Sequence, residues 1–314
     1  MRSRIKNFPS ILLSVCILGA FLAFLAFPAR YLHCVADGVT LWATSVLPAA
    51  LPFLFLTGLL SQTPIFARVA RWLSPVFRLF GISGAGGCAA LLSLLSGYPA
   101  GAKTVERLCD QGRLCEDERL RCAALASTSG PAFLVGVAGA AMMHSAALGW
   151  MLFFAHVAGI LGISLILGRG KKNARQVISP PQIQPTNMAR IVPETLTSSV
   201  LSVLCVGGAV AIFYAFGCML SDALAPLSLP TPITATLAGL LEMTAGCSRL
   251  LSSPTPLTLA IAAFLVTFGG ACVLVQQWSF LYRTGIPLGK FLLIKLFHAL
   301  LAAIICFLLA FLVL

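Results

Sequence analysis

Between Arg121 and Arg169 the chain contains no aspartate, glutamate, lysine or arginine. An uncharged stretch of that length is enough for two membrane-spanning helices, since one span needs about 20 mostly apolar residues. The rest of the chain has the same character: 59% of its 314 residues are hydrophobic and only 10% are charged. A typical soluble domain has about 25% charged residues. The sequence therefore predicts an all-α polytopic membrane protein and excludes a soluble enzyme or a disordered chain.

The apolar segments that are long enough to cross a bilayer predict about seven transmembrane helices. They are residues 8–31, 39–60, 122–143, 146–167, 200–220, 257–281 and 291–314. A cleaved signal peptide is the alternative interpretation of the first of them. Residues 65–80 place three arginines among apolar side chains, a pattern typical of a helix that lies in the cytoplasmic membrane interface.

Two further apolar segments, residues 82–95 and 233–241, are too short to cross a bilayer. Each leads into residues that interrupt a helix, around Gly97 and Pro99 in the first and at 242–246 in the second. We therefore expect two re-entrant hairpins with tips at 97–101 and 242–246. We also expect two spans to be broken, one at residues 127–131 and the other at residues 268–270.

The order span, hairpin, broken span, span occurs twice along the chain. With a cytoplasmic N-terminus, all lysines and arginines except Arg30 and Arg249 fall on the cytoplasmic side, as the positive-inside rule requires. The two hairpins then enter from opposite faces, giving an inverted-topology repeat of the kind found in secondary transporters. The expected divisions are an N-terminal transmembrane helix at 1–38, a first repeat at 39–168, a basic cytoplasmic linker at 169–198 and a second repeat at 199–314.

Glu242 is the main candidate for a functional residue, because an ionisable group within an apolar arm is costly in a membrane. It can bind a cation, take a proton or accept hydrogen bonds; the alternatives are a structural ion pair with Arg249 or exposure at the outer mouth. The other candidates are residues at the tips and breaks that offer hydroxyl, amide or backbone groups to a ligand: Tyr98, Gly101, Thr128, Ser129, Gly130, Thr244, Gly269 and Gln276. The structural alternatives are a proline kink at residues 127–131 and interhelical hydrogen bonding by the glutamines, which we favour for Gln277.

Several functions are not expected. No catalytic motif is present, so we do not expect an enzyme. The eleven cysteines include no C-x-x-C pair, so we expect neither a disulfide nor a metal site, and no cofactor. The basic residues lie between apolar segments rather than on one patch, so we expect no nucleic acid partner. The expected partners are the lipid bilayer, a small polar solute or a coupling cation, and a second copy of the chain.

The interrupted segments also carry a family resemblance. The strings SGYPAGAK at 96–103, STSGP at 127–131, LEMTAG at 241–246 and FGG at 268–270, the last followed by Gln276, resemble the YlbJ-like sporulation integral membrane proteins. The resemblance covers residues 40–314. It implies a Gate, or nucleoside-recognition, domain in a multi-pass protein of the cell membrane, with a role in forming the spore cortex or envelope.

Similar domains occur in concentrative nucleoside transporters, where two hairpin tips and two unwound helices form the ligand site. The resemblance therefore implies a transporter or permease-like protein for a small polar solute. The alternative is a non-transporting membrane scaffold for spore assembly.

Overall fold

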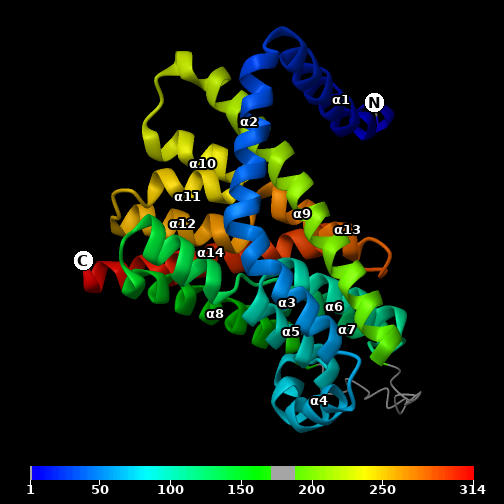
Figure 1. Cartoon of the computed structure of the whole chain (residues 1–314). Coiled ribbons are helices and arrows are strands. Elements are labelled where there is room, and N and C mark those ends of the chain that lie inside the picture. The colour runs from blue at the N-terminus through cyan, green and yellow to red at the C-terminus, as the bar shows by residue number, and fades with distance from the viewer. Residues whose placement is uncertain (1, 171–187) are drawn as a thin grey trace.

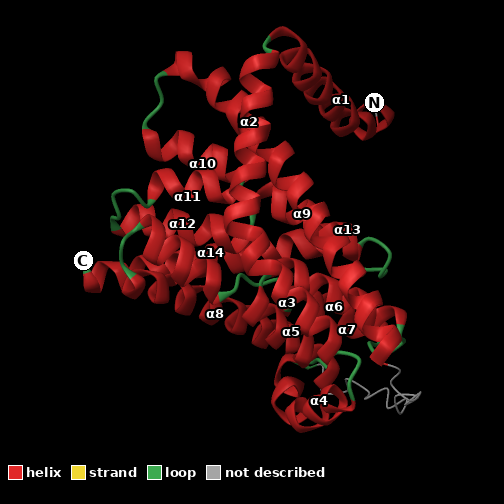
Figure 2. Ribbon diagram, in the orientation of Figure 1, coloured by secondary structure: helices red, strands yellow, loops and turns green. Residues whose placement is uncertain are grey.

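The computed structural model describes residues 2–170 and 188–314, and within them every regular element is a helix (Figures 1 and 2). The prediction of an all-α polytopic membrane protein is confirmed. Four described segments are long and apolar enough to cross a membrane, or up to six when each of two bent helix pairs is counted as one span. The predicted span at residues 122–143 is interrupted between two short helices, and neither of them is long enough to cross a membrane.

The N-terminal region differs from the first two predicted spans. Helix α1 (Arg2–Ala26) ends before residue 31, and α2 (Pro28–Leu41) leaves it at an angle of 109°. The cause is local, because Phe27 is not helical and Pro28, in the first turn of α2, has no backbone N–H to continue the ladder. Helix α1 therefore projects from the body of the molecule (Figure 1).

Helix α2 continues through a π-helical turn, η1 (Trp42–Val46), into α3 (Leu47–Leu60). The indole N–H of Trp42 donates to the carbonyl of Val203, 3.1 Å away. This hydrogen bond joins the continuous segment formed by α2, η1 and α3 to α9 (Met188–Leu224), the long helix beside it in Figure 1. The start of α9 at Met188 also shortens the predicted linker, because residues 188–198 are helical. The remainder of that linker, 171–187, lies outside the described residues.

Helix α4 (Pro64–Phe77) and the 3-10 turn η2 (Arg78–Phe80) lie at 87° to α3. Their buried stripe contains Phe66, Ala70 and Phe77. A second stripe at the same helical spacing is apolar yet exposed: Ile65, Val69, Trp72, Val76 and Leu79. A helix with one face against the protein, one apolar face outward and arginines alongside suits the membrane interface predicted for residues 65–80.

The first predicted hairpin is formed by α5 (Gly84–Ser96) and α6 (Tyr98–Asp110). The broken segment that follows it consists of α7 (Glu116–Leu125), an irregular stretch at 126–131, and the π-helical η3 (Ala132–Met142). Helix α8 (Ala146–Gly168) completes the first half.

The second half has the same order of elements. After α9 and the 3-10 turn η4 (Ala225–Leu227), α10 (Thr231–Leu241) and α11 (Met243–Leu250) form the second hairpin. The broken span follows as α12 (Pro256–Phe268) and α13 (Gly270–Leu281), and the chain ends with α14 (Leu288–Val313).

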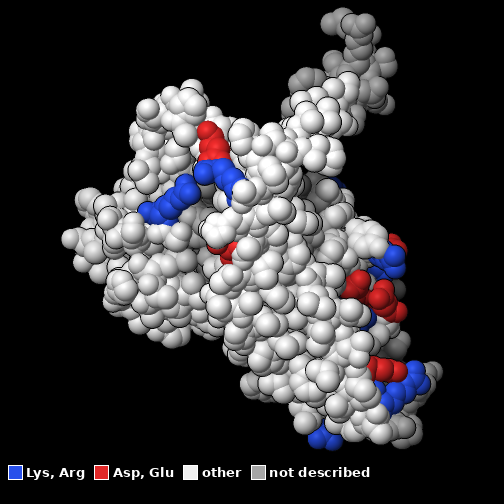
Figure 3. All heavy atoms as spheres, turned by 45° about the horizontal axis from the view of Figure 1, so that its top comes forward, with Lys and Arg blue, Asp and Glu red and all other residues white. Residues whose placement is uncertain are grey.

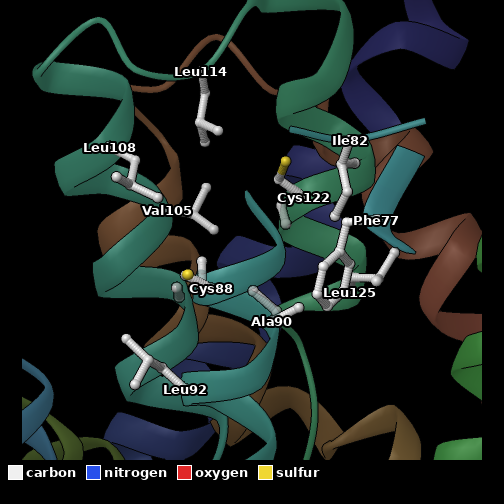
Figure 4. Close-up of a cluster of buried hydrophobic side chains, with 14 of the residues drawn as sticks. Phe77, Ile82, Cys88, Ala90, Leu92, Val105, Leu108, Leu114, Cys122 and Leu125 are labelled. Carbon is white, nitrogen blue, oxygen red and sulfur yellow. The ribbon is translucent and has the colours of Figure 1, made fainter. Parts of the chain in front are cut away.

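Two large apolar clusters hold the elements together. One lies between α4, α5, α6 and α7, where Phe77, Cys88, Val105 and Cys122 are almost fully buried (Figure 4). The other lies between α8, α11, α12 and α14 and includes Leu152, Leu259 and Cys306. Most of the face shown in Figure 3 is uncharged, and its charged side chains form separate groups in the upper part and along the right and lower right side of the view. An uncharged surface is what a lipid-exposed zone requires.

Candidate functional site

The tip of the first hairpin turns at Gly97, which has φ +89°. Such a conformation favours glycine, because a Cβ atom would be strained there. Tyr98 and Pro99 then form the first turn of α6, and no side chain caps this helix N-terminus. Close to the tip, Gly101 allows the two arms to touch: a Cβ atom built on it would lie 2.0 Å from the carbonyl oxygen of Ala126 and 2.3 Å from Ser93 Oγ.

The tip of the second hairpin turns at Glu242, which is extended and 2% exposed. Its carboxylate accepts hydrogen bonds from the backbone N–H groups of Thr244 (3.1 Å) and Ala245 (2.8 Å). These donors belong to the first turn of α11, so the side chain is the N-cap of that half-helix. The expected alternative of an ion pair with Arg249 is wrong, since no ion pair between described residues includes Glu242 and Arg249 lies 3.5 Å from Ser221 Oγ.

Each hairpin tip packs against a glycine of the broken segment that follows it in sequence. A Cβ atom on Gly130 would lie 3.0 Å from the carbonyl oxygen of Leu95, at the end of α5. A Cβ atom on Gly270 would lie 2.7 Å from the carbonyl oxygen of Gly239, near the end of α10. The same close approach therefore occurs in both halves of the chain, although few residues are identical between them.

The two tips, the first break and helix α13 line a common pocket, which we call the tip pocket; it encloses about 870 Å³ of empty space including its open mouth. Of the residues proposed from the sequence, the structure brings six to it: Tyr98, Ser129, Gly130, Glu242, Thr244 and Gln276. The remaining wall comes from η1, α3, η3, α9 and α13 and is mostly apolar, with Val46, Phe53, Phe133, Val206 and Val273 among its residues. A mostly apolar pocket with a few converging polar groups is the usual form of a small-molecule site.

Three residues proposed from the sequence lie beside the pocket rather than on its wall. Gly101, on α6, is enclosed by Ser93 of the other hairpin arm and by Ala126 at the start of the first break. The hydroxyl of Thr128 donates to Ser93 Oγ at 3.0 Å. Gly269, with φ +92°, ends α12 and lets the chain turn into α13. Their observed contacts are structural, because each shapes a tip or a break.

A buried hydrogen-bond network lies behind the tip pocket. The Tyr98 hydroxyl donates to the carbonyl of Val266. The backbone N–H of Ser129 donates to His156 Nε2 at 3.0 Å, and His156 Nδ1 lies 2.8 Å from the Thr267 hydroxyl. This chain of contacts joins the first hairpin and its break to the last turn of α12, so the two halves of the molecule meet directly at the site.

Sequence reasoning did not single out Lys295 or the role of His156. Lys295 lies on α14 and is 1% exposed, with its Nζ atom among the groups of this network. One signal was available, since Lys295 is the one lysine or arginine within the apolar segment 291–314. Gln277 makes the interhelical hydrogen bond that we favoured for it, because Ser127 Oγ donates to its side-chain oxygen.

Metal-ligating side chains do not gather in the described part of the chain: no three His, Cys, Asp or Glu residues are placed to hold one ion. The polar atoms of the tip pocket come instead from one carboxylate, hydroxyls, amides and the backbone.

The fold and pocket define a class: a polytopic α-helical membrane protein in which two interrupted hairpins and two broken segments enclose a mostly apolar pocket with a few converging polar groups. Comparison with known proteins agrees. Residues 43–146 match the Gate family model, described as nucleoside recognition. The chain is 28% identical over 309 residues to the sporulation integral membrane protein YlbJ of Bacillus subtilis (strain 168), covering 87% of this chain and 76% of that one. No solved structure matches it significantly. The chain is therefore similar to an integral membrane protein of sporulation, and its apolar helices fit a multi-pass membrane protein.

Proposed function

We propose that this chain is a permease-like protein that moves a small polar solute across the membrane through the tip pocket during spore formation. The observation that carries the proposal is the convergence of both hairpin tips and residues of both broken segments on one pocket. Breaking a helix in hydrocarbon is costly, because backbone N–H and C=O groups lose their partners. Paired breaks around a shared polar cavity are the arrangement that secondary transporters use for their ligands.

The charge of the pocket favours solutes without negative charge. Half-helix N-termini usually attract anions, but at α11 the carboxylate of Glu242 already occupies the two N–H groups that would do so. No lysine, arginine or histidine is among the residues that line the pocket. An uncharged or positively charged solute is therefore favoured over a phosphorylated one, which an ionised Glu242 would repel.

The hydrogen-bonding groups of the tip pocket further restrict the class of solute that it fits. At the uncapped N-terminus of α6 the backbone of Tyr98 offers an N–H donor, while Glu242 offers carboxylate oxygens and Ser129 a hydroxyl. A solute with both acceptors and donors on an otherwise flat or apolar body suits this combination. Nucleosides have this chemistry, and the description of the matching family makes them the first compounds to test.

A second hollow next to the tip pocket supplies a route for the solute. Leu41 and Thr244 line both spaces, and the second continues past Tyr214 and Ser248 to Arg249. In the proposed topology the N-terminus is cytoplasmic and Arg249 lies on the outer side, so this hollow is the outer approach to the site. Opening on the opposite side would follow from rocking one repeat against the other.

The decisive experiment is uptake by purified protein in liposomes. The panel contains neutral nucleosides, amino sugars and small amides, with nucleoside monophosphates as the anionic comparison. Wild-type protein should accumulate one neutral or cationic class above empty liposomes and none of the monophosphates. Glu242→Gln should reduce that uptake at least tenfold, because the variant loses the carboxylate charge and one of two good acceptors.

The matched control is Glu116→Gln, an exposed glutamate at the start of α7, which should transport like wild type. Both variants must be monodisperse and inserted to the same extent. Full uptake by Glu242→Gln would remove Glu242 from the mechanism. If no compound is moved by wild-type protein, the alternative of a non-transporting scaffold for spore assembly gains support.

A further inference from the structure

The side chain of Lys295 ends between the two broken segments. Its Nζ atom lies 3.2 Å from the carbonyl oxygen of Ser127 and 2.5 Å from that of Thr267. Ser127 follows the end of α7 at Leu125, and Thr267 is in the last turn of α12. One amino group from α14 therefore donates to a carbonyl of the first break, just beyond α7, and to a carbonyl in the last turn of α12, which belongs to the other half of the chain.

These carbonyls need such a partner. The last carbonyls of a helix have no intrahelical donor, and they form the negative end of the helix dipole. Within a bilayer no water is available to satisfy them. A carbonyl of a helix end and a carbonyl of a helix break that meet at one place make a site for a positive charge, in the way that backbone carbonyls coordinate cations at broken helices of transporters.

The remaining surroundings of Nζ are also those of a cation site. The Tyr98 ring faces it, with the ring centroid 4.7 Å from Nζ, a distance at which an ammonium is attracted to an aromatic face. The titratable groups packed nearby are His156 and His298, whose rings lie 4.8 Å apart. Among the described residues no carboxylate is within ion-pair distance of Lys295. Dipoles and a ring, rather than a counter-ion, hold the charge.

We propose that the ammonium group of Lys295 is a tethered cation that fills a monovalent-cation site built by the break after α7 and the end of α12. The ligand class of this site is a small ammonium ion, supplied by the protein itself. Because Tyr98 and Ser129 belong to both this cluster and the tip pocket, Lys295 is a positioning residue for the pocket. The inference does not depend on transport, and its test needs no transported solute.

The test removes the Lys295 side chain beyond Cβ and supplies the missing atoms as a free cation. Lys295→Ala deletes the atoms of a propylammonium ion, so propylammonium chloride is the probe. Purified wild type, Lys295→Ala and Lys295→Met are heated with increasing propylammonium, and the Tm is followed by tryptophan fluorescence. Without the probe, both variants should melt roughly 4–10 °C below wild type, since buried carbonyls lose a charge-assisted donor. Propylammonium should raise the Tm of Lys295→Ala along a saturating curve, as binding to the folded state requires.

Three controls make the result specific. Propanol has the same length without the charge and should have no saturating effect on Lys295→Ala. Lys295→Met fills the space, so propylammonium should not restore it. Lys290→Ala, at an exposed lysine of the same helix, should behave like wild type at every concentration.

Several outcomes would overturn the proposal. They are a Lys295→Met protein as stable as wild type, a Lys295→Ala protein whose Tm ignores propylammonium, and equal rescue by propanol. If Lys295→Ala does not fold alone, the same comparison uses the yield of monodisperse protein extracted with and without propylammonium. An unchanged yield would then count against a cation site, and a restored yield would support it.

Discussion

The hydroxyl of Tyr98 donates a hydrogen bond to the carbonyl oxygen of Val266, which ties the tip of the first hairpin to the last turn of α12. Both groups are buried, and the two residues belong to opposite halves of the chain. This hydrogen bond therefore joins the two halves of the chain directly beside the tip pocket.

Replacing Tyr98 by phenylalanine should weaken that junction. The ring and its contact with Lys295 remain, but the buried carbonyl of Val266 loses its donor, at a cost of about 1–3 kcal/mol. Denaturant unfolding in detergent should show this as a lower midpoint. Tyr282→Phe, at an exposed tyrosine just after α13, should leave the midpoint unchanged. Equal midpoints for Tyr98→Phe and wild type would show that the hydrogen bond does not stabilise the fold.

Gly101 should not accept even one methyl group. Alanine there would place its Cβ atom against the Ala126 carbonyl and Ser93 Oγ, and the arms would have to separate, at a cost of at least about 1–3 kcal/mol. We expect Gly101→Ala to lower the Tm and the yield of folded protein. Gly208→Ala is the comparison, because its Cβ atom would meet nothing within 4 Å and alanine is the better helix former. A Gly101→Ala protein as stable as Gly208→Ala would contradict the observed arm spacing.

Trp72 should lie among lipid headgroups. It is 80% exposed on the outward apolar stripe of α4, while Trp42 donates to Val203 inside the protein. In vesicles containing lipids brominated near the headgroup, Trp72 fluorescence should be strongly quenched. The Trp72→Phe variant should lose the quenched component, and Trp42→Phe should retain it. Quenching that is unchanged by Trp72→Phe would place α4 in water instead.

The bases of the two hairpins should face opposite sides of the membrane if the repeats are inverted. In a variant whose native cysteines are replaced, Gln111→Cys reports on the loop after α6 and Ser252→Cys on the loop after α11, both exposed positions. A membrane-impermeant thiol reagent applied to intact cells should label Ser252→Cys and should label Gln111→Cys only after permeabilisation. Labelling of both positions from outside would exclude the inverted arrangement.

The interruptions were predictable from sequence because their causes are local. Gly97 with Pro99 two residues later, and the Gly269–Gly270 pair, interrupt a straight helix, and the structure breaks the helices at these positions. Six of the candidate residues then line one pocket because tips and breaks pack together. That packing also gives the short apolar segments the partners that a single short arm would lack.

The rest depends on tertiary contacts that no local pattern encodes. Phe27 lies in an apolar segment that predicts one continuous span, yet α1 ends just before it and α2 begins just after it. Glu242 and Arg249 are seven residues apart in sequence, but the carboxylate satisfies the nearer backbone N–H groups of its own half-helix instead. From the sequence, Lys295 is a single charged residue near one end of a predicted span. Its contacts with Ser127 and Thr267 arise only from the tertiary fold.

The glycines that cover the hairpin tips have a consequence for biogenesis. Gly130 and Gly270 are each synthesised after the hairpin tip that they cover. During translation each tip is therefore made before the segment that packs on it. Since lipid cannot solvate exposed peptide groups, we expect each hairpin to settle in the membrane only together with the broken segment that follows it, so that insertion proceeds repeat by repeat.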